Sequence, residues 1–253
     1  MRIAITTDTH FGFSKNTLSI HETFFKKLAM EKFDVFVHSG DISSNKQKHL
    51  FKSLRMMRDI LKDVPILFIL GNHDLWDKRF PRNYVSYNEM RRKQRSLFKE
   101  LGVHYLQDEP FYIDGVKFYG YDGWYKTNPP SNDFLWMHRM MKGVPSNIYL
   151  RKRSYDSLDR ILLDSELDKK NNPGIKLVCV THHNLSSNYR DGCSSMSGDP
   201  KHLEFLSENF DLIINGHTHS EEDRLFIGKE LHKCRVLNAG SCYDNPKYMI
   251  VEI

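Results

Sequence analysis

Short apolar runs and longer amphipathic segments alternate along the first hundred residues of the chain. Three apolar runs have the length and composition of buried strands, at about 2–7, 34–38 and 66–70. Between them, apolar residues recur at helical spacing over two segments, at about 17–31 and 45–62. Strands that alternate with helices in this order predict a parallel sheet with right-handed crossovers, and therefore an α/β fold.

The remainder of the chain continues this pattern with more and shorter strands. We predict strands at about 103–106, 110–113, 116–121, 176–181 and 211–215, and hairpin strands within 223–253. Helices are predicted at about 84–101, 154–168 and 200–209. Asp114-Gly115 is a typical hairpin turn, and Pro173-Gly174 follows the end of a predicted helix.

One long segment, at about 122–150, is irregular and rich in aromatic residues. Loops of this length are usually functional or mobile. We interpret the segment as a loop or small helical insertion in a single domain that spans residues 1–253. Its residues Trp124, Tyr125, Phe134 and Trp136 either wall a substrate pocket or form a small core beneath the loop.

Side chains of the kinds that bind metals follow five of the apolar runs, within about three residues of each strand end. They are Asp8 and His10, Asp41, Asn72 with His73 and Asp74, His182 with His183, and His217 with His219. Because the loops at the carboxyl ends of strands gather at one edge of an α/β sheet, these side chains are expected to meet. Carboxylate, amide and imidazole donors suit Mn, Fe, Zn or Co, so the sequence predicts a metal centre, with two ions favoured.

As a set, these motifs resemble those of the calcineurin-like metallophosphoesterase superfamily. The residues that carry the resemblance are Asp8-Thr9-His10, Gly40-Asp41, Gly71-Asn72-His73-Asp74, His182 and Gly216-His217-Thr218-His219. The resemblance implies a four-layer α/β sandwich of two mixed β-sheets flanked by helices, with the metal site at the carboxyl ends of the strands. It also implies one metal ion held by Asp8, His10, Asp41 and His219. A second ion would be held by Asp41, Asn72, His182 and His217, so that Asp41 bridges the two.

The activity that this resemblance implies is hydrolysis of a phosphomonoester or phosphodiester bond. Two divalent cations about 3.5–4 Å apart would clamp the attacking and leaving oxygens and supply a metal-activated hydroxide. Manganese is favoured, with iron, zinc, cobalt or mixed occupancy as alternatives. His73 would protonate the leaving oxygen or stabilise the transition state. Asp74 would fix the tautomer and orientation of the His73 imidazole.

The fourth motif departs from the pattern His-His-x-Pro that is common in this superfamily. Here the residues are His182-His183-Asn184-Leu185. We assign His182 as the ligand because it lies closer to the predicted strand. His183 is expected to face substrate or solvent, and His38 is expected to be a packed or hydrogen-bonded histidine at a strand end.

The overall charge is compatible with an anionic substrate but does not by itself indicate nucleic acid. The chain has 253 residues and a formal net charge of +5, a modest excess for its length. A basic run on a predicted helix comprises Arg91, Arg92, Lys93, Arg95 and Lys99. A solvated helix face is the favoured interpretation, and a contact surface for a phosphate backbone is the alternative. No aromatic residues interleave the run, so nucleic acid is a possible but not a favoured partner.

The sequence also carries expectations about location. No run of 18 or more apolar residues is present, so we expect no membrane-spanning helix and no membrane partner. The N-terminal residues lack the features of a signal peptide. The cysteines, Cys179, Cys193, Cys234 and Cys242, form no CxxC pair, which favours a cytoplasmic protein with reduced thiols. The oligomeric state is left open.

Two alternatives to a general phosphoesterase are retained. A nuclease of the same superfamily is suggested by Asp8-Thr9-His10-Phe11-Gly12, although the chain has little room for the capping domain of such enzymes. The second alternative is a non-catalytic scaffold for protein interactions. Such relatives lack metal ligands or the catalytic histidine, whereas every ligand position is filled here and His73 is present. The physiological substrate, and whether it is a monoester or a diester, stay open.

Overall fold

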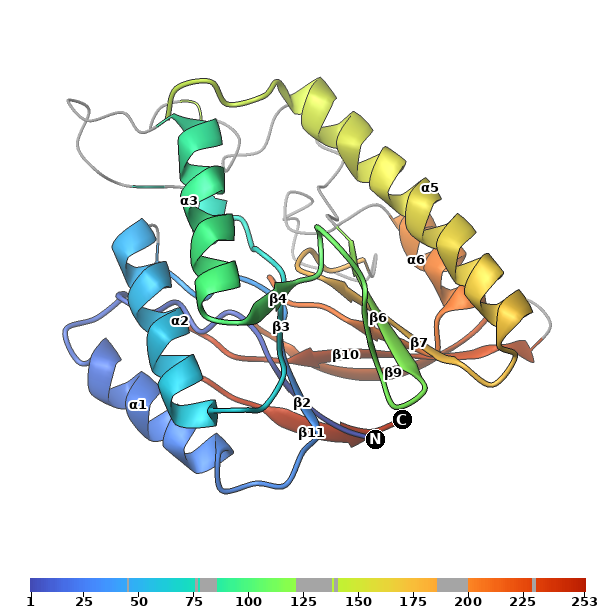
Figure 1. The fold of residues 1–253 in the computed structure, drawn as a ribbon, viewed down its shortest axis with the longest axis horizontal. Helices are drawn as coiled ribbons and strands as arrows, with labels where there is room; N and C mark the ends of the chain where they lie inside the picture. Colours follow the sequence, from blue (N-terminus) through green and yellow to red (C-terminus); the bar gives the residue numbers. More distant parts are fainter. Residues whose placement is uncertain are drawn as a thin grey trace.

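Two β-sheets lie at the centre of the protein, which we describe from a computed structural model (Figure 1). The structure describes residues 1–44, 46–75, 77, 86–121, 138, 141–185, 200–228 and 231–253. The first sheet has the strand order β11-β1-β2-β3-β4, and the second has the order β5-β6-β7-β8-β10-β9. Each sheet is mixed, because antiparallel strands border a parallel centre.

The first sheet and its helices come from the amino-terminal half and the last strand. In chain order they are β1 (Arg2–Thr6), α1 (Thr17–Leu28), β2 (Val35–His38), α2 (Gln47–Leu61), β3 (Ile66–Phe68), the 3-10 helix η1 (His73–Leu75), α3 (Tyr87–Glu100), β4 (Val103–Tyr105) and β11 (Met249–Glu252). Strands β1 to β4 are parallel, and β11 pairs antiparallel with β1. The predicted β-α-β order of this half is confirmed.

The second sheet comes from the middle and late parts of the chain. Its elements are β5 (Phe111–Ile113), β6 (Val116–Tyr121), α5 (Asn147–Asn171), β7 (Lys176–Thr181), α6 (Pro200–Asn209), β8 (Leu212–Ile214), β9 (Glu221–Ile227) and β10 (Lys233–Ala239). Strands β6, β7, β8 and β10 are parallel. The Asp114-Gly115 turn joins β5 to β6 as predicted, with positive φ at both residues, which the tight hairpin requires.

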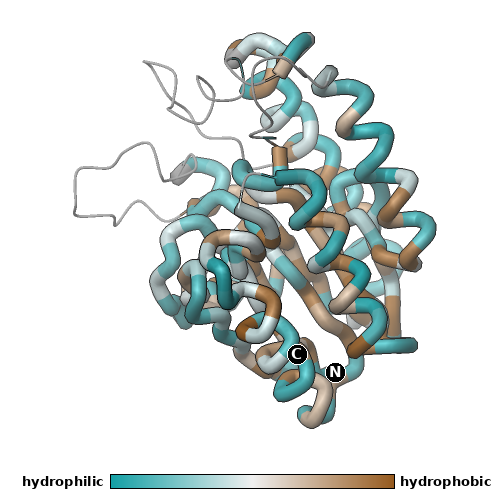
Figure 2. Tube along the Cα trace, turned by 90° about the vertical axis from the view of Figure 1, so that its left-hand side faces the viewer, coloured by the Kyte–Doolittle hydropathy of each residue, from teal (hydrophilic) through white to brown (hydrophobic). Residues whose placement is uncertain are grey.

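Three hydrophobic clusters show how the layers pack. Alternation along β1 sends Ile3 and Ile5 into the cluster between the two sheets, and Ala4 into the cluster beneath α1 and α2. A third cluster lies between the second sheet and helices α5 and α6. Figure 2 shows the hydrophobic strand segments, in brown, inside the molecule. The architecture is helices, sheet, sheet, helices, so the predicted four-layer sandwich is confirmed.

Helix α5 differs from its prediction. It runs from Asn147 to Asn171, whereas the sequence pattern predicted a helix over about 154–168. The helix begins early because the Ser146 side chain caps it, accepting a hydrogen bond from the backbone N–H of Tyr149 at 3.2 Å. Its first turns carry few apolar residues in a helical pattern, which is why periodicity missed them. The carboxyl end of the segment expected to be irregular is therefore helical.

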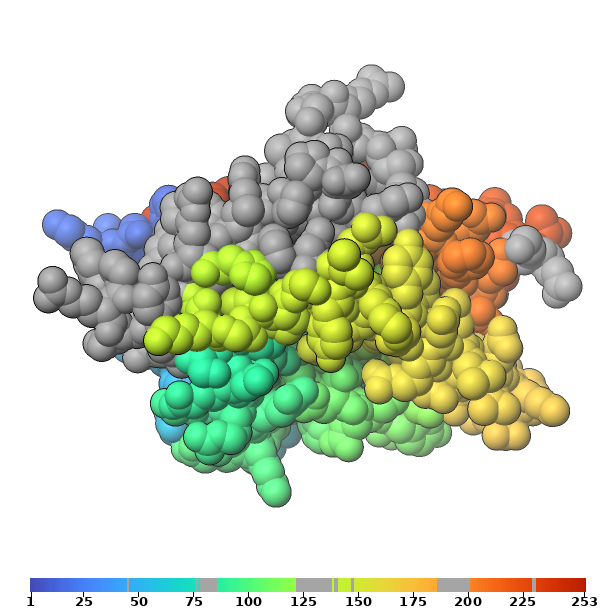
Figure 3. All heavy atoms as spheres, turned by 90° about the horizontal axis from the view of Figure 1, so that it is seen from above, coloured from blue at the N-terminus to red at the C-terminus, as the bar shows by residue number. Residues whose placement is uncertain are grey.

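Residues 141 and 142, just before α5, contact helix α3. Tyr87 and Met90 of α3 pack with Met141 and with Leu150 of α5, and the backbone N–H of Tyr87 donates to the carbonyl of Lys142. Figure 3 shows α5, in yellow, crossing the face of the molecule next to the green segments. Most of the predicted insertion, at 122–137 and 139–140, lies outside the described residues, together with its residues Trp124, Tyr125, Phe134 and Trp136.

Candidate metal centre

The loops that follow the strands hold several candidate ligands in an unusual backbone conformation. Asp8, His10, Asp41, His217 and His219 all have positive φ, at 47°, 47°, 54°, 70° and 54°. A non-glycine residue with positive φ costs about 1–3 kcal/mol and persists only where the surrounding structure enforces it. Such residues cluster at functional sites. Five of the seven predicted ligands therefore stand on strained backbone.

Glycines allow these loops to approach one another closely. A Cβ atom on Gly71 would collide with the carboxylate of Asp41. One on Gly216 would collide with the side chains of Thr7 and Asp8. These two glycines, which precede candidate ligands in the sequence, are thus required by close packing between loops.

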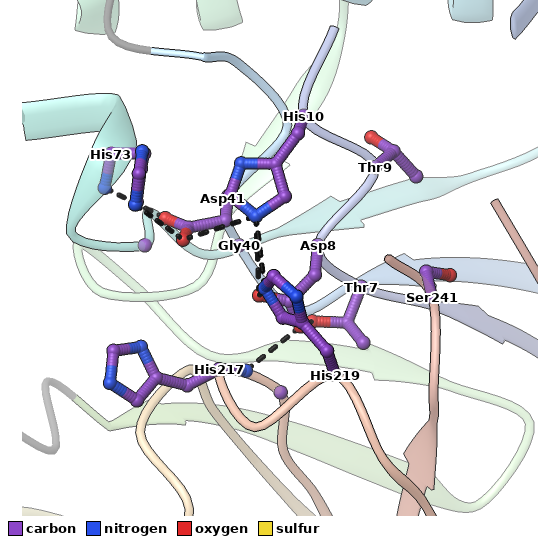
Figure 4. A network of polar contacts seen from close by, with 12 residues as sticks. Thr7, Asp8, Thr9, His10, Gly40, Asp41, His73, His217, His219 and Ser241 are labelled. Atoms are coloured by element: carbon purple, nitrogen blue, oxygen red, sulfur yellow. Dashed lines mark hydrogen bonds and ion pairs between the residues drawn. The ribbon is translucent and has the colours of Figure 1, made fainter. Parts of the chain in front are cut away.

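Hydrogen bonds connect the loops of the two sheets at the site. The backbone N–H of Asp8 donates to the carbonyl of Gly40, and that of His10 donates to the carbonyl of Asp41, at 2.9 and 3.0 Å. The N–H of His217, in the loop after β8, donates to Asp8 Oδ2 at 2.8 Å. The edges of both sheets are in this way joined at one point (Figure 4).

The structure brings all seven predicted ligands and His73 together. Three groups have candidate ligand atoms within 4.8 Å of one another: Asp8 with His10 and His219, His10 with Asp41 and His73, and Asp41 with His182 and His217. Asn72 joins the third group, since its Oδ1 lies 3.0 Å from both His182 Nε2 and His217 Nδ1. Asp41 belongs to two of the groups and lies between them.

The cluster has a buried part and an open edge. The side chains of Asp8 and His10 are fully buried, and those of Asp41 and His182 nearly so. The side chains of His73 and His219 are each 22% exposed. The open edge of the cluster therefore lies at these two histidines.

The buried charges indicate that the residues fit a cation. In the described part of the chain, no lysine or arginine forms an ion pair with Asp8 or Asp41. Asp8 Oδ1 is buried without a hydrogen-bond partner among the described residues. Burying a carboxylate is costly unless it is paired or coordinates a metal. Divalent cations among these donors would offset that cost.

Two of the candidate ligands are in the protonation state that binds metals. Burial lowers the pKa of His10 to about 4 and that of His217 to about 3, so both imidazoles are neutral, the form that binds metals. Burial disfavours the charged forms of Asp41 and His182, but their mutual attraction is stronger. It raises the pKa of His182 to about 10 and holds that of Asp41 well below its usual value. A histidine must be neutral to bind a metal, so a cation bound beside Asp41 would displace the proton of His182.

The Asp74 carboxylate holds two of the loops in place. It accepts hydrogen bonds from the backbone N–H groups of Ser43 at 3.0 Å, Gly71 at 3.1 Å and Ile42 at 3.3 Å. Burial and the nearby charge of Asp41 raise its pKa to about 7. These three hydrogen bonds are all with backbone, and the pairing of Asp74 with the His73 imidazole stays a prediction.

A polar network beneath this loop was missed by sequence reasoning. The side-chain amides of Gln47 in α2 and Gln94 in α3 each donate to the carbonyl of Asp74 at 2.8 Å. Gln94 also donates to Gln47 and accepts from Arg91, a hydrogen bond of 2.7 Å. The available signal was that Gln94 lies on the apolar face of its helix, between Met90 and the pair Leu97-Phe98.

The same network corrects one interpretation of the basic helix. Arg91 is buried, because its guanidinium bonds Gln94 and the hydroxyl of Tyr105. The predicted solvated face is therefore wrong for Arg91. It is confirmed for the other members of the run, Arg92, Lys93, Arg95 and Lys99, which are exposed.

The remaining histidines occupy distinct positions. The Nε2 atom of His182 faces Asn72, and its Nδ1 lies 2.9 Å from the carbonyl of Ser39, which holds the ring in place. His183 is buried next to the ring of His217, so the interpretation that it faces solvent is wrong. His38 is a hydrogen-bonded histidine at a strand end, as predicted, with Nε2 3.0 Å from the hydroxyl of Thr9.

Tyr243 is another residue that sequence reasoning missed. Its ring stacks on that of His10, with centroids 4.6 Å apart and planes at 27°. It also contacts the ring of His219 edge-on at 5.0 Å. Tyr243 follows the loop Gly240-Ser241-Cys242, whose Ser241 hydroxyl accepts a hydrogen bond from the N–H of Lys247. No sequence motif indicated this contact, because it depends on how the loop after β10 folds back.

The protein is a two-sheet α/β sandwich. At its strand ends it gathers buried aspartate, asparagine and histidine side chains, and this places it among proteins with a candidate metal centre. The family model for calcineurin-like phosphoesterases matches residues 1–221. The chain therefore belongs to the calcineurin-like phosphoesterase family. No curated protein sequence matches it.

Solved structures share this fold at low sequence identity. The phosphopantetheinyl hydrolase of Mycobacterium tuberculosis has a TM-score of 0.69 and 16% identity, over 96% of this chain and 89% of that one. A dimetal phosphatase of Danio rerio has a TM-score of 0.61 and 12% identity, over 99% and 91%. GAP50, the anchor in the inner membrane complex of Plasmodium, has a TM-score of 0.53 and 15% identity, over 99% and 80%. At these identities the likeness shows the fold alone.

Two further findings concern the helices and a cavity of the molecule. Among the described helices, none has both the length and the apolar character needed to cross a membrane. A cavity of about 760 Å³ lies between α1 and the loop at residues 244–248, and none of the predicted ligands lines it. The donor cluster is therefore identified by its chemistry and not by the size of a nearby cavity.

Proposed function

We propose that this protein is a phosphoesterase that hydrolyses phosphomonoester or phosphodiester bonds with two divalent metal ions, manganese being favoured. The observation that carries the proposal is the convergence of the complete donor set around Asp41. Every donor is an oxygen or an imidazole nitrogen, the kinds that suit manganese, iron, zinc and cobalt.

The donors divide into two sets that share Asp41. We propose that Asp8, His10, Asp41 and His219 hold one ion, at the open edge. Support comes from Asp8 Oδ1, which lies 3.5 Å from His219 Nε2 and 3.9 Å from His10 Nε2. We propose that Asp41, Asn72, His182 and His217 hold the other, in the buried part. Here Asp41 Oδ2 lies 3.4 Å from His182 Nε2, and Asn72 Oδ1 contacts both imidazoles.

Two such ions, when bound, would offset phosphoryl charge and make hydroxide available near neutral pH. The chain itself contributes position and protons. His73 is held by its own backbone N–H, which donates to Asp41 Oδ1 at 2.8 Å. Its ring meets that of His10 edge-on at 4.7 Å, and the side chain is partly exposed at the open edge. This position supports the proposal that His73 delivers a proton to the leaving oxygen.

The proposal is tested with purified protein reconstituted with Mn²⁺ and a chromogenic monoester and diester. We expect hydrolysis of at least one ester by the wild type and its loss in Asp41→Ala. Asp59→Ala is the matched control, because Asp59 is exposed on α2. Equal rates for wild type and Asp41→Ala would refute the proposal. Metal binding without hydrolysis of either ester would favour the scaffold alternative.

A panel of substrates then separates the enzymatic alternatives. Rates are compared in Mn²⁺ on a mononucleotide, a cyclic nucleotide, single-stranded DNA and a phosphoprotein. A preference for single-stranded DNA over the small esters would favour the nuclease alternative. A preference for one small ester would set the choice between monoester and diester.

A further inference from the structure

An exposed phenylalanine stands beside the donor cluster. The backbone N–H of Phe13 donates to the carbonyl of His10 at 3.2 Å, which closes a turn immediately after that candidate ligand. The turn passes through Gly12, whose φ is 94° and where a Cβ would collide with the ring of His49. This turn leaves the Phe13 side chain 58% exposed.

Tyr243 connects this exposed ring to the cluster. The rings of Phe13 and Tyr243 lie with centroids 4.3 Å apart and planes at 32°. Tyr243 in turn stacks on His10. The three rings form a series that begins at a candidate ligand and ends at an exposed aromatic face. We call Phe13 and Tyr243 the aromatic platform.

The platform is held in place by contacts from two loops. The hydroxyl of Ser14 donates to Asp244 Oδ1 at 2.8 Å, which links the loop after β1 to the loop after β10. The N–H of Gly12 donates to the hydroxyl of Thr17 at 2.9 Å. Tyr243 has a φ of 38°, a strained conformation of the kind that persists at functional sites. The two rings are therefore positioned before any ligand arrives.

Packing of the hydrophobic core does not account for this arrangement. Among the described residues, neither Phe13 nor Tyr243 belongs to the three clusters between the layers or to the small cluster where α3 meets α5. A phenylalanine that is more than half exposed contributes little to folding, because most of its ring remains in water. The contacts of the platform instead lead to His10 and His219 at the open edge of the site.

We propose that the aromatic platform binds a planar aromatic or heteroaromatic group of the substrate while the phosphate lies at the donor cluster. This inference rests on the proposed phosphoesterase function and names a substrate class for it, esters that carry an aryl group or a nucleobase. A ring stacked on Phe13 would gain offset or edge-on contacts with an aromatic face that is already ordered.

The test measures binding, so that it does not depend on which ester is hydrolysed. Calorimetry in Mn²⁺ compares phenylphosphonate with methylphosphonate, and adenosine 5′-monophosphate with ribose 5-phosphate. Wild type is expected to bind the ring-bearing member of at least one pair about tenfold more tightly. A difference in the phosphonate pair identifies an aryl group as the bound ring, and a difference in the other pair identifies a nucleobase.

Variants then assign the preference to the platform. Phe13→Ala should remove most of the tenfold preference and leave the affinity for methylphosphonate and ribose 5-phosphate unchanged. Phe13→Tyr should keep it, and so should Tyr112→Ala, which removes a comparably exposed ring on β5.

Three results would overturn the inference. Equal affinity within both pairs in wild type would show that the platform binds no ring, while the phosphoesterase proposal would stand on its own test with Asp41→Ala. Retention of the preference in Phe13→Ala would place ring recognition elsewhere. If none of the four compounds binds in Mn²⁺, both the inference and the proposed site for phosphate fail.

Discussion

The buried half of the donor cluster and its open edge are built differently. In the buried half, Asp41, His182 and His217 are enclosed and Asn72 bonds both imidazoles. At the open edge, His73 and His219 are partly exposed. His10 contacts the rings of His73 and Tyr243, and its Nε2 lies 3.1 Å from His219 Nε2. On the proposed assignment each half holds one ion, and the difference in exposure leaves only the open edge to meet substrate as well.

The largest effect is expected at the residue that both halves share. Asp41→Asn should reduce metal content and lower kcat by more than about 100-fold. A loss of roughly 100-fold is typical when a residue that only hydrogen-bonds a metal ligand is removed. Removing the negative charge weakens both proposed ion sites at once. Metal content by plasma mass spectrometry and steady-state rates are measured on the same preparation. A variant that keeps two ions and full activity would show that Asp41 does not bridge.

A smaller and more selective effect is expected at the open edge. His73→Ala should lower kcat on the order of 10²-fold, because a positioned acid is lost from the leaving oxygen. Its metal content should match that of wild type, since His73 lies outside both proposed ligand sets. Loss of metal along with activity would instead make His73 a ligand and change the assignment of the edge.

Changes in the polar network of Gln47 and Gln94 beneath Asp74 should lower activity less than changes in the donor cluster itself. Gln94→Leu removes one hydrogen bond each from the Asp74 carbonyl, the Gln47 side-chain carbonyl and the Arg91 guanidinium. A typical hydrogen bond contributes about 0.5–1.5 kcal/mol to stability. We expect a lower free energy of unfolding in urea and a fall in kcat of about tenfold as the loop shifts. Arg92→Leu, an exposed change on the same helix, is the control. Equal stability of the two variants would contradict a supporting role for Gln94.

The smallest effect is expected on the exposed basic face of α3. Arg92→Ala and Lys99→Ala should change the hydrolysis of small esters by less than about twofold, since exposed charges on a solvated surface contribute little. The measurement is repeated with single-stranded DNA at low and moderate salt. A large loss confined to DNA would support the nuclease alternative and would assign this face to the phosphate backbone.

The sequence predicted the parts of this molecule that depend on local pattern. Apolar runs such as Ile3–Ile5 and Val35–Val37 are strands because their side chains are buried on both faces of a sheet, and that burial leaves a pattern in one dimension. The donors follow those runs directly, so that their convergence could be inferred from the fold class. The Asp114-Gly115 turn could also be predicted, because this tight hairpin needs positive φ and Asp-Gly is one of the few residue pairs that adopt it readily.

Features that depend on contacts between distant segments were not predicted. Gln47 and Gln94 meet beneath Asp74 only after α2 and α3 pack side by side. Tyr243 reaches His10 only because the loop after β10 returns to the loop after β1. The early start of α5 was missed because its first turn has no apolar stripe: Ile148 and Tyr149 are exposed, and only Leu150 beside them is buried. The aromatic residues singled out at 122–150 lie outside the described structure, whereas Phe13 and Tyr243 attracted no attention in the sequence.

The central claim, that one carboxylate joins two metal ions, is tested most directly by electron paramagnetic resonance of the protein titrated with Mn²⁺. The account predicts that two ions bind per chain and that their spectrum shows the spin coupling of a bridged pair. Asp41→Asn should abolish this coupling. Saturation at one ion per chain, or the spectrum of isolated Mn²⁺ at full occupancy, would contradict the account.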